Sequence, residues 1–127
     1  MILDYIKYFL NAKDEHSLHS PFVFNFYTKI LKDKSFYKEY TDIETLRKQL
    51  LNDNRIVNIN DFGAGAKTNK SIQRKVSDIA RKSLKKPSLA QFFYRIIKNY
   101  QYSTILDFGT SLGLTTAYLG KANQKTK

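Results

Sequence analysis

The sequence has no cysteine and no tryptophan, and only two prolines and one methionine among its 127 residues. Without cysteine, a disulfide framework, a thiolate metal site and a cysteine nucleophile are all excluded. No apolar run approaches the roughly 20 residues that a membrane-spanning helix needs, so we expect no membrane span. The N-terminal residues carry neither a basic leader nor a small-residue cleavage site, so no signal peptide is expected. These absences together predict a soluble, cytoplasmic protein.

Large apolar side chains are plentiful, because nine Phe and nine Tyr help to bring the apolar share of the chain to 42%. A chain of this length and composition can bury a modest core, which predicts one globular domain and not a disordered tail. The chain is nevertheless short for a complete doubly wound sheet with an added cap.

Acidic residues are scarce, with 11 Asp and Glu against 22 Lys and Arg, for a formal net charge of +11. Most of the excess lies in residues 67–86, which hold eight Lys or Arg and one Asp. A local positive field of this kind attracts anions, whether nucleic acid, a phosphorylated metabolite, an acidic protein or an anionic membrane surface. Charge alone does not choose among these partners.

The spacing of apolar residues predicts that most of the chain is helical. Ser20 followed by Pro21 is typical of an N-cap with proline in the first turn. The spacings Thr41 to Glu44 and Ser88 to Gln91 each fit a capping box at a helix start. Helices are expected over residues 2–12, from Pro21 to Leu31, from Thr41 to Leu51, from about residue 72 to Pro87, and from Ser88 to Tyr100.

Two short strands are expected, over residues 55–62 and 104–108, and each is followed by a turn that contains glycine. The first turn, Asp61–Thr68, superficially evokes a phosphate loop, but Gly63 and Gly65 are too close together for the required spacing. We expect this turn either to close a helical cap or to fold over a cofactor or substrate.

The second turn is the most informative feature of the sequence, because residues 104–120 form a pattern of strand, glycine turn and helix. Gly109 permits a sharp turn or a close backbone approach, and Gly113 would let the helix pack tightly against the strand. Asp107 can accept hydrogen bonds from an ammonium or hydroxyl group, and amides at residues 110–112 face outward at a helix N-terminus. Such a turn suits an adenosyl ligand, although the same spacing also occurs at ordinary strand-to-helix connections.

The stretch from Leu106 to Leu119 resembles the first motif of class I S-adenosylmethionine-dependent methyltransferases, notably their O-methyltransferase-like branch. In that branch an acidic residue precedes Gly-Thr-x-x-Gly and a helix start rich in Ser and Thr. The segments His19–Phe24, Asp61–Gly65 and Arg74–Ala80 also look like the N-terminal portion of bacterial members of the superfamily. The resemblance implies a mostly helical α/β chain, with an N-terminal helical cap over residues 1–102 and the first strand, turn and helix of an incomplete Rossmann-like sheet over 103–127.

The same resemblance implies that S-adenosylmethionine lies on the motif, with its methionine and ribose parts over Asp107, Gly109, Thr110, Ser111 and Gly113. Ser111 departs from the more common Gly-x-Gly-x-Gly, and a side chain there would narrow the approach of the backbone to the cofactor. The family places its ribose-binding carboxylate, its substrate site and its catalytic groups further along the chain. We therefore expect this chain to be the N-terminal fragment of an enzyme that methylates a small molecule, and to have no activity of its own. Its open strand edges would favour self-association.

Other residue patterns offer fewer site residues. His16 and His19 have no carboxylate or thiol at metal-ligand spacing, so no metal site is expected, and no nucleophile, base and orienting acid can be assembled from spacing. The basic segment 67–86 is either a solvated face or a surface for an acidic partner, and Arg74, Lys75, Arg81 and Lys82 are the residues to test. Two rival hypotheses thus stand beside the methyltransferase: a non-enzymatic helical module that binds nucleic acid or another polyanion, and a structural remnant without independent function.

Overall fold

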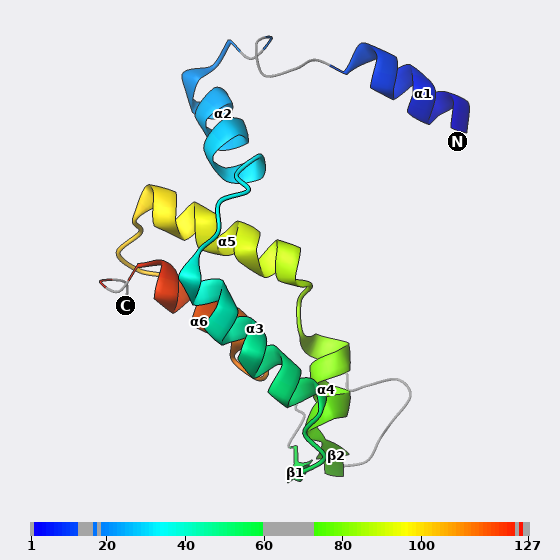
Figure 1. Cartoon of the computed structure of the whole chain (residues 1–127), viewed down its shortest axis with the longest axis vertical. Coiled ribbons are helices and arrows are strands. Elements are labelled where there is room, and N and C mark those ends of the chain that lie inside the picture. Colours follow the sequence, from blue (N-terminus) through cyan, green and yellow to red (C-terminus); the bar gives the residue numbers. More distant parts are fainter. Residues whose placement is uncertain (1, 13–16, 18, 60–72, 124, 126–127) are drawn as a thin grey trace. The chain divides into compact units, whose positions relative to one another are not determined.

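The computed structural model describes residues 2–12, 17, 19–59, 73–123 and 125, and these are mostly helical with a two-stranded antiparallel sheet (Figure 1). The chain divides into two compact units, Met1–Ser35 and Phe36–Lys127. The turn predicted at Asp61–Thr68 lies outside the described residues. The predicted boundary between a cap and a Rossmann-like domain at residue 102 stays a prediction, and residues 103–123 lie within the second compact unit.

The first unit contains α1 (Ile2–Asn11) and α2 (Pro21–Phe26), and α2 continues into the π-helical turn η2 (Tyr27–Leu31). The predicted cap is confirmed, because the Ser20 side chain accepts a hydrogen bond from the Val23 amide at 3.4 Å and Pro21 occupies the first turn. Proline is tolerated there because the first amides of a helix have no partner inside it.

Helix α1 is confirmed at its predicted place, and it carries large apolar side chains around most of its circumference. Its polar residues Asp4, Lys7 and Asn11 are three and four apart, so they share one narrow face. None of its residues is buried, and Ile2 is 79% exposed.

The second unit is a helical assembly made of α3 (Lys38–Leu51), α4 (Val76–Ser83), α5 (Pro87–Tyr100) and α6 (Leu114–Ala122). Helix α6 packs against both α3 and α5, while α3 also packs against α4 (Figure 1). The core is formed by buried apolar residues of α3, α5 and α6, namely Tyr40, Ile43, Ala90, Tyr94, Ile97, Leu114, Tyr118 and Ala122.

Three buried tyrosines form the centre of this core. The Tyr40 ring meets the Tyr94 ring edge-on at 5.1 Å and the Tyr118 ring at 5.6 Å, and Tyr94 and Tyr118 lie 6.4 Å apart. Edge-to-face packing at these distances is favourable because the positive edge of one ring meets the negative face of another. One ring from each helix therefore joins α3, α5 and α6.

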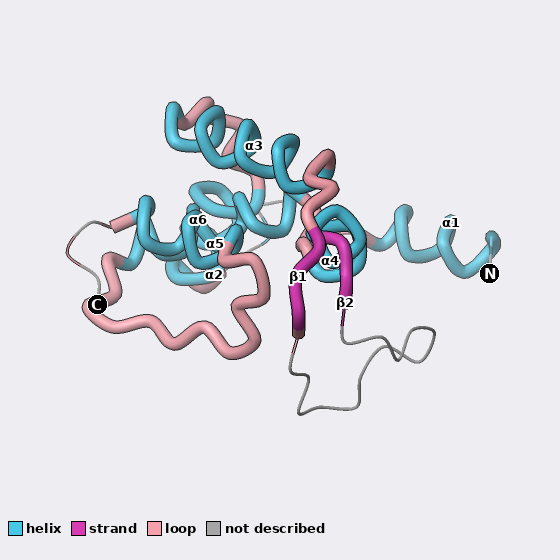
Figure 2. The backbone as a smooth tube through the Cα atoms, turned by 90° about the horizontal axis from the view of Figure 1, so that it is seen from below, coloured by secondary structure: helices cyan, strands magenta, loops and turns pink. Residues whose placement is uncertain are grey.

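The sheet is a pair of three-residue strands, β1 (Ile56–Asn58) and β2 (Gln73–Lys75), which run antiparallel with Val57 opposite Arg74 (Figure 2). The predicted strand at 55–62 is thus confirmed over 56–58, and residues 60–62 lie outside the described residues. The helix predicted from about residue 72 begins later, at Val76, because residues 73–75 pair with β1.

The strand predicted over 104–108 is wrong, because the whole connection between α5 and α6 is loop (Figure 2). A strand is stabilised by hydrogen bonds to a neighbouring strand, and none of the described residues pairs with this segment. Ile105 packs against the helical core, whereas Leu106 and Phe108 are 76% and 90% exposed. The Rossmann-like parallel sheet is therefore not seen in the described part of the chain.

The two predicted capping boxes are also wrong. Helix α3 begins at Lys38, so Thr41 lies within its first turn, where its carbonyl accepts the Thr45 hydroxyl at 2.8 Å. Helix α5 begins at Pro87, one residue before Ser88, and neither helix has a side-chain cap. Proline can open a helix because its fixed backbone angle suits the first turn.

Candidate functional site

The turn before α6 is built from residues with left-handed backbone angles. Gly109, Ser111 and Gly113 have φ of 76°, 51° and 73°, and the Gly113 amide donates to the Thr110 carbonyl at 2.8 Å. A Cβ atom added at Gly109 or Gly113 would meet nothing within 4 Å. Glycine is favoured here by the backbone angle and not, as predicted for Gly113, by tight packing of the helix.

Asp107 is held against the first turns of α6. Its Oδ2 accepts a hydrogen bond from the Thr116 hydroxyl at 2.6 Å, and the residue is half-buried. The sequence predicted Asp107 at the end of a strand, whereas it lies in the loop before α6. Its side chain connects that loop to α6. The carboxylate is thus already oriented by a protein hydroxyl.

A small pocket lies between this turn and the segment that joins α4 to α5. Its volume is about 60 Å³, and it is lined by Ser83, Leu84, Lys85, Asp107, Phe108, Gly109, Thr110, Ser111, Leu114 and Thr115. Four of the five residues that the family resemblance marks as cofactor-binding thus share one pocket, while Gly113 is not among the lining residues and instead precedes α6.

The opposite wall of the pocket, residues 83–85, was not predicted. The Ser111 hydroxyl donates to the Ser83 hydroxyl at 2.9 Å, and this hydrogen bond joins the two walls. The two serines are 28 positions apart, and no spacing rule relates residues at that separation. Ser83 ends α4, a helix that the sequence analysis predicted without assigning any of its residues to this pocket.

The size of the pocket limits what it can hold by itself. Pockets for cofactors and drug-sized ligands have volumes of roughly 300–1,000 Å³. A volume of about 60 Å³ has room for a few water molecules or a small polar group, and not for an adenosyl ligand. The described residues therefore form one corner of a cofactor site at most.

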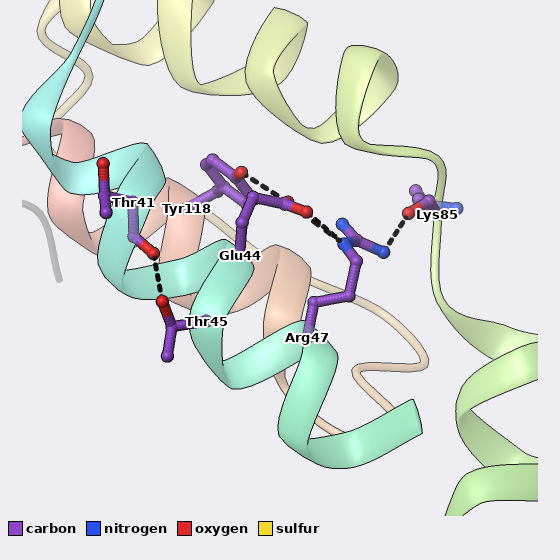
Figure 3. A network of polar contacts seen from close by, with 6 residues as sticks. All are labelled: Thr41, Glu44, Thr45, Arg47, Lys85 and Tyr118. Atoms are coloured by element: carbon purple, nitrogen blue, oxygen red, sulfur yellow. Dashed lines mark hydrogen bonds and ion pairs between the residues drawn. The ribbon is translucent and has the colours of Figure 1, made fainter. Parts of the chain in front are cut away.

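A polar network lies beside the pocket and links α3, α6 and the segment between α4 and α5 (Figure 3). Glu44 of α3 accepts hydrogen bonds from Arg47 Nε at 2.8 and 3.0 Å and from the Tyr118 hydroxyl of α6 at 2.7 Å. Arg47 Nη1 also donates to the Lys85 carbonyl at 2.7 Å, in the segment between α4 and α5. The sequence assigned Glu44 to a capping box, and its actual partner on α6 is 74 positions away.

Burial governs the ionisation of the core tyrosines. Removal from water raises the pKa of Tyr118 well above its usual value, and the hydrogen bond to Glu44 raises it further. Burial also raises the pKa of Tyr94, with smaller contributions from the Glu39 carboxylate and the neighbouring tyrosines. Both side chains therefore remain neutral at physiological pH.

The basic residues chosen for testing lie on and beside α4. Lys75, Arg81 and Lys82 are exposed, and Arg74 is half-buried in β2. Arg81 donates to Asp78 at 3.2 Å and to the Leu51 carbonyl at 3.3 Å, so part of its hydrogen-bonding capacity is used within the fold. Two further lysines of the basic segment, Lys67 and Lys70, lie outside the described residues.

The described residues contain neither a cluster of metal-ligating side chains nor a helix that could cross a membrane. Among them, no cluster of three or more His, Cys, Asp or Glu side chains is placed to hold a metal ion, and His19 is exposed while His16 lies outside them. No helix in that part of the chain has the length and apolar character needed to cross a membrane. Comparison with protein-family models, with curated proteins and with solved structures finds no match to this chain.

Proposed function

We propose that this chain is the N-terminal part of an S-adenosylmethionine-dependent methyltransferase, in which the turn before α6 contributes to the cofactor site. The observation that carries the proposal is the grouping of Asp107, Gly109, Thr110 and Ser111 around one pocket at the start of α6. These are four of the five residues that the resemblance to the methyltransferase motif marks. The first amides of a helix lack partners inside it, and two residues of the first turn of α6, Leu114 and Thr115, line this pocket.

The chemistry of the proposed reaction needs little from the residues around the turn. A methyl group passes from the sulfonium of S-adenosylmethionine to a nucleophilic atom of a small-molecule acceptor, whose bond to the methyl carbon forms as the carbon–sulfur bond breaks. The protein mainly aligns the reacting atoms and excludes water. No catalytic residue is assigned among the described residues.

A complete cofactor site requires further walls. The pocket of about 60 Å³ falls far short of a cofactor-sized cavity, and the loop at 104–108 has no neighbouring strand among the described residues. We propose that additional strands pair with this loop and enclose the cofactor, and that this chain without them does not methylate. The exposed side chains of Leu106 and Phe108 would then be covered.

The test is a calorimetric titration of S-adenosylmethionine into this chain and into a longer polypeptide that supplies the proposed additional strands. We expect binding by the longer polypeptide only. Asp107→Ala in the longer polypeptide should weaken binding, whereas Asp42→Ala, which removes an exposed carboxylate of α3, should not. A longer polypeptide that ignores the cofactor would reduce the turn to a structural connection and remove the proposal.

A second candidate function is the binding of a polyanion, and the exposure of Lys75, Arg81 and Lys82 around α4 favours it. The segment from 73 to 86 contains no aromatic residue, so binding would depend on charge and not on stacking with bases.

The test compares two variants that lose the same charge. Alanine at Arg74, Lys75, Arg81 and Lys82 should abolish binding to a DNA or RNA oligonucleotide and flatten its salt dependence. Alanine at the exposed lysines Lys38, Lys48, Lys121 and Lys125 should leave most of the binding in place. Equal losses in the two variants would indicate only a general attraction to a cationic protein, and unchanged binding in the first would exclude this surface.

A further inference from the structure

The pocket beside the turn before α6 has two walls that belong to distant parts of the chain. One wall is the segment 83–85, which begins at the last residue of α4, and the other is the turn and start of α6 at 107–115. Among the side chains that line the pocket, one hydrogen bond connects the two walls directly. The Ser111 hydroxyl donates to the Ser83 hydroxyl, and both residues are exposed. A single exposed hydroxyl pair contributes little rigidity, so the spacing of the walls must be set elsewhere.

The Glu44–Arg47 pair contacts one wall directly and also contacts the helix that carries the other wall. Arg47 Nη1 donates to the Lys85 carbonyl at 2.7 Å, and Glu44 Oε1 accepts from the Tyr118 hydroxyl at 2.7 Å (Figure 3). Lys85 lines the pocket, and Tyr118 lies one turn beyond the α6 residues Leu114 and Thr115 that also line it. One ion pair on α3 therefore holds the backbone of one wall and the helix of the other.

The pair is well placed to hold them firmly. Arg47 is 8% exposed and Glu44 is mostly shielded, and both contacts between them are 3.0 Å or shorter. Hydrogen bonds that involve an ionised group are about twice as strong as neutral ones. The flat, forked guanidinium also fixes directions that the point charge of lysine does not.

Arg47 is not used to its full capacity, because its buried Nη2 has no hydrogen-bond partner among the described residues. A buried donor without a partner costs stability. Arg47 therefore carries a cost that its contacts with Glu44 and with the Lys85 carbonyl must offset.

We propose that Glu44 and Arg47 are positioning residues that set the spacing of the two pocket walls. The inference rests on the proposed function only in treating this pocket as part of a cofactor site. Arg47 positions the Lys85 wall, and Glu44 positions α6 through Tyr118.

The test measures amide hydrogen exchange by NMR in this chain without any ligand, so it can fail while the methyltransferase proposal holds, and the reverse. Two amides report on the Lys85 wall, because Leu84 donates to the Ala80 carbonyl and Ala90 donates to the Lys86 carbonyl. Two others report on the second wall, because Gly113 donates to the Thr110 carbonyl and Ala117 to the Gly113 carbonyl.

Arg47→Lys keeps the charge opposite Glu44 and loses the fork that reaches Lys85. We expect exchange at Leu84 and Ala90 to become about tenfold faster, as the loss of one charged hydrogen bond implies, with Gly113 and Ala117 unchanged. Tyr118→Phe should produce the opposite pattern, with faster exchange on the α6 wall only. Selective effects of this kind distinguish positioning from a general loss of stability, which would raise all four rates together.

The matched control is Arg81→Lys. Arg81 also lies three residues after its acidic partner and also donates to a backbone carbonyl, but its side chain is 62% exposed. The Arg81→Lys substitution should leave amide exchange at Ala90, Gly113 and Ala117 unchanged. The proposal is overturned if folded Arg47→Lys leaves Leu84 and Ala90 unchanged, or if it accelerates all four amides equally. Should Arg47→Lys fail to fold, Tyr118→Phe alone decides, because equal acceleration on both walls would refute the separate linkage.

Discussion

Replacing Gly113 by alanine tests whether the turn before α6 depends on its left-handed backbone. Gly113 has φ of 73°, and an added Cβ would meet nothing within 4 Å, so the substitution introduces strain without a steric clash. Left-handed angles cost an L-residue about 1–2 kcal/mol, and the reduced freedom of the unfolded chain returns about 0.4–1 kcal/mol. We expect Gly113→Ala to lower the free energy of unfolding by about 1 kcal/mol.

The control is the same substitution at Gly120, seven residues further towards the C-terminus. Gly120 lies inside α6, its backbone angle is not left-handed, and a Cβ there would also meet nothing within 4 Å. Glycine inside a helix costs roughly 0.5–1 kcal/mol relative to alanine, so Gly120→Ala should raise the free energy of unfolding by that amount. The two substitutions thus have opposite expected signs on one helix.

The assay is urea unfolding followed by circular dichroism at the helical band, with thermal unfolding as a second measure. For a unit of this size, 1 kcal/mol corresponds to a shift of roughly 4–8 °C in Tm. A Gly113→Ala variant as stable as the parent would refute the left-handed assignment of the turn. A loss well above 2 kcal/mol would show that the side chain meets other atoms.

Four further predictions concern the second unit. Gln101→Gly should raise the free energy of unfolding by about 0.5–1 kcal/mol in urea titrations, because Gln101 ends α5 in a left-handed conformation that glycine adopts without strain. In a spectrophotometric titration, Tyr94 and Tyr118 should ionise at higher pH than the exposed tyrosines, because burial raises their pKa values in the folded protein. Ionisation of all nine tyrosines in one transition near their usual pKa would contradict the burial of these two. The unfolded chain loses these two protons at lower pH than the folded protein does. The free energy of unfolding should therefore be unchanged below about pH 10 and fall as the pH rises above it, and a free energy that stays constant at alkaline pH would contradict the raised pKa values. Tyr94→Ala should lower the free energy of unfolding by about 3–5 kcal/mol, measured in urea, since its ring is 0% exposed, and a loss below 1 kcal/mol would mean that the core is not packed around it.

The start of α2, which is encoded by neighbouring residues, was predicted correctly. Ser20 and Pro21 start a helix through contacts within a single turn, and the sequence therefore contains the whole explanation. Features that depend on a distant partner were not predicted. Glu44 has the spacing of a capping residue, yet its carboxylate accepts from Tyr118, whose approach depends on how α6 packs against α3.

The same distinction applies to the strand and to the candidate site. Residues 104–108 have the composition of a strand, but a strand also needs a partner, and the described residues supply none. Asp107, Gly109, Thr110 and Ser111 are close in sequence, so their grouping at one pocket was predictable. Ser83, across the pocket, became a lining residue only through the packing of helices.

The two short strands have a consequence for the start of α4. This helix has no side-chain cap, and its first amides, those of Val76 and Ser77, donate instead to the carbonyls of Arg55 at 3.0 Å and Asp53 at 2.9 Å. Every residue has a carbonyl and every residue except proline has an amide, so these bonds do not depend on which side chains occupy the positions. The beginning of α4 should therefore tolerate the replacement of most side chains around it, because hydrogen bonds between backbone atoms cap it.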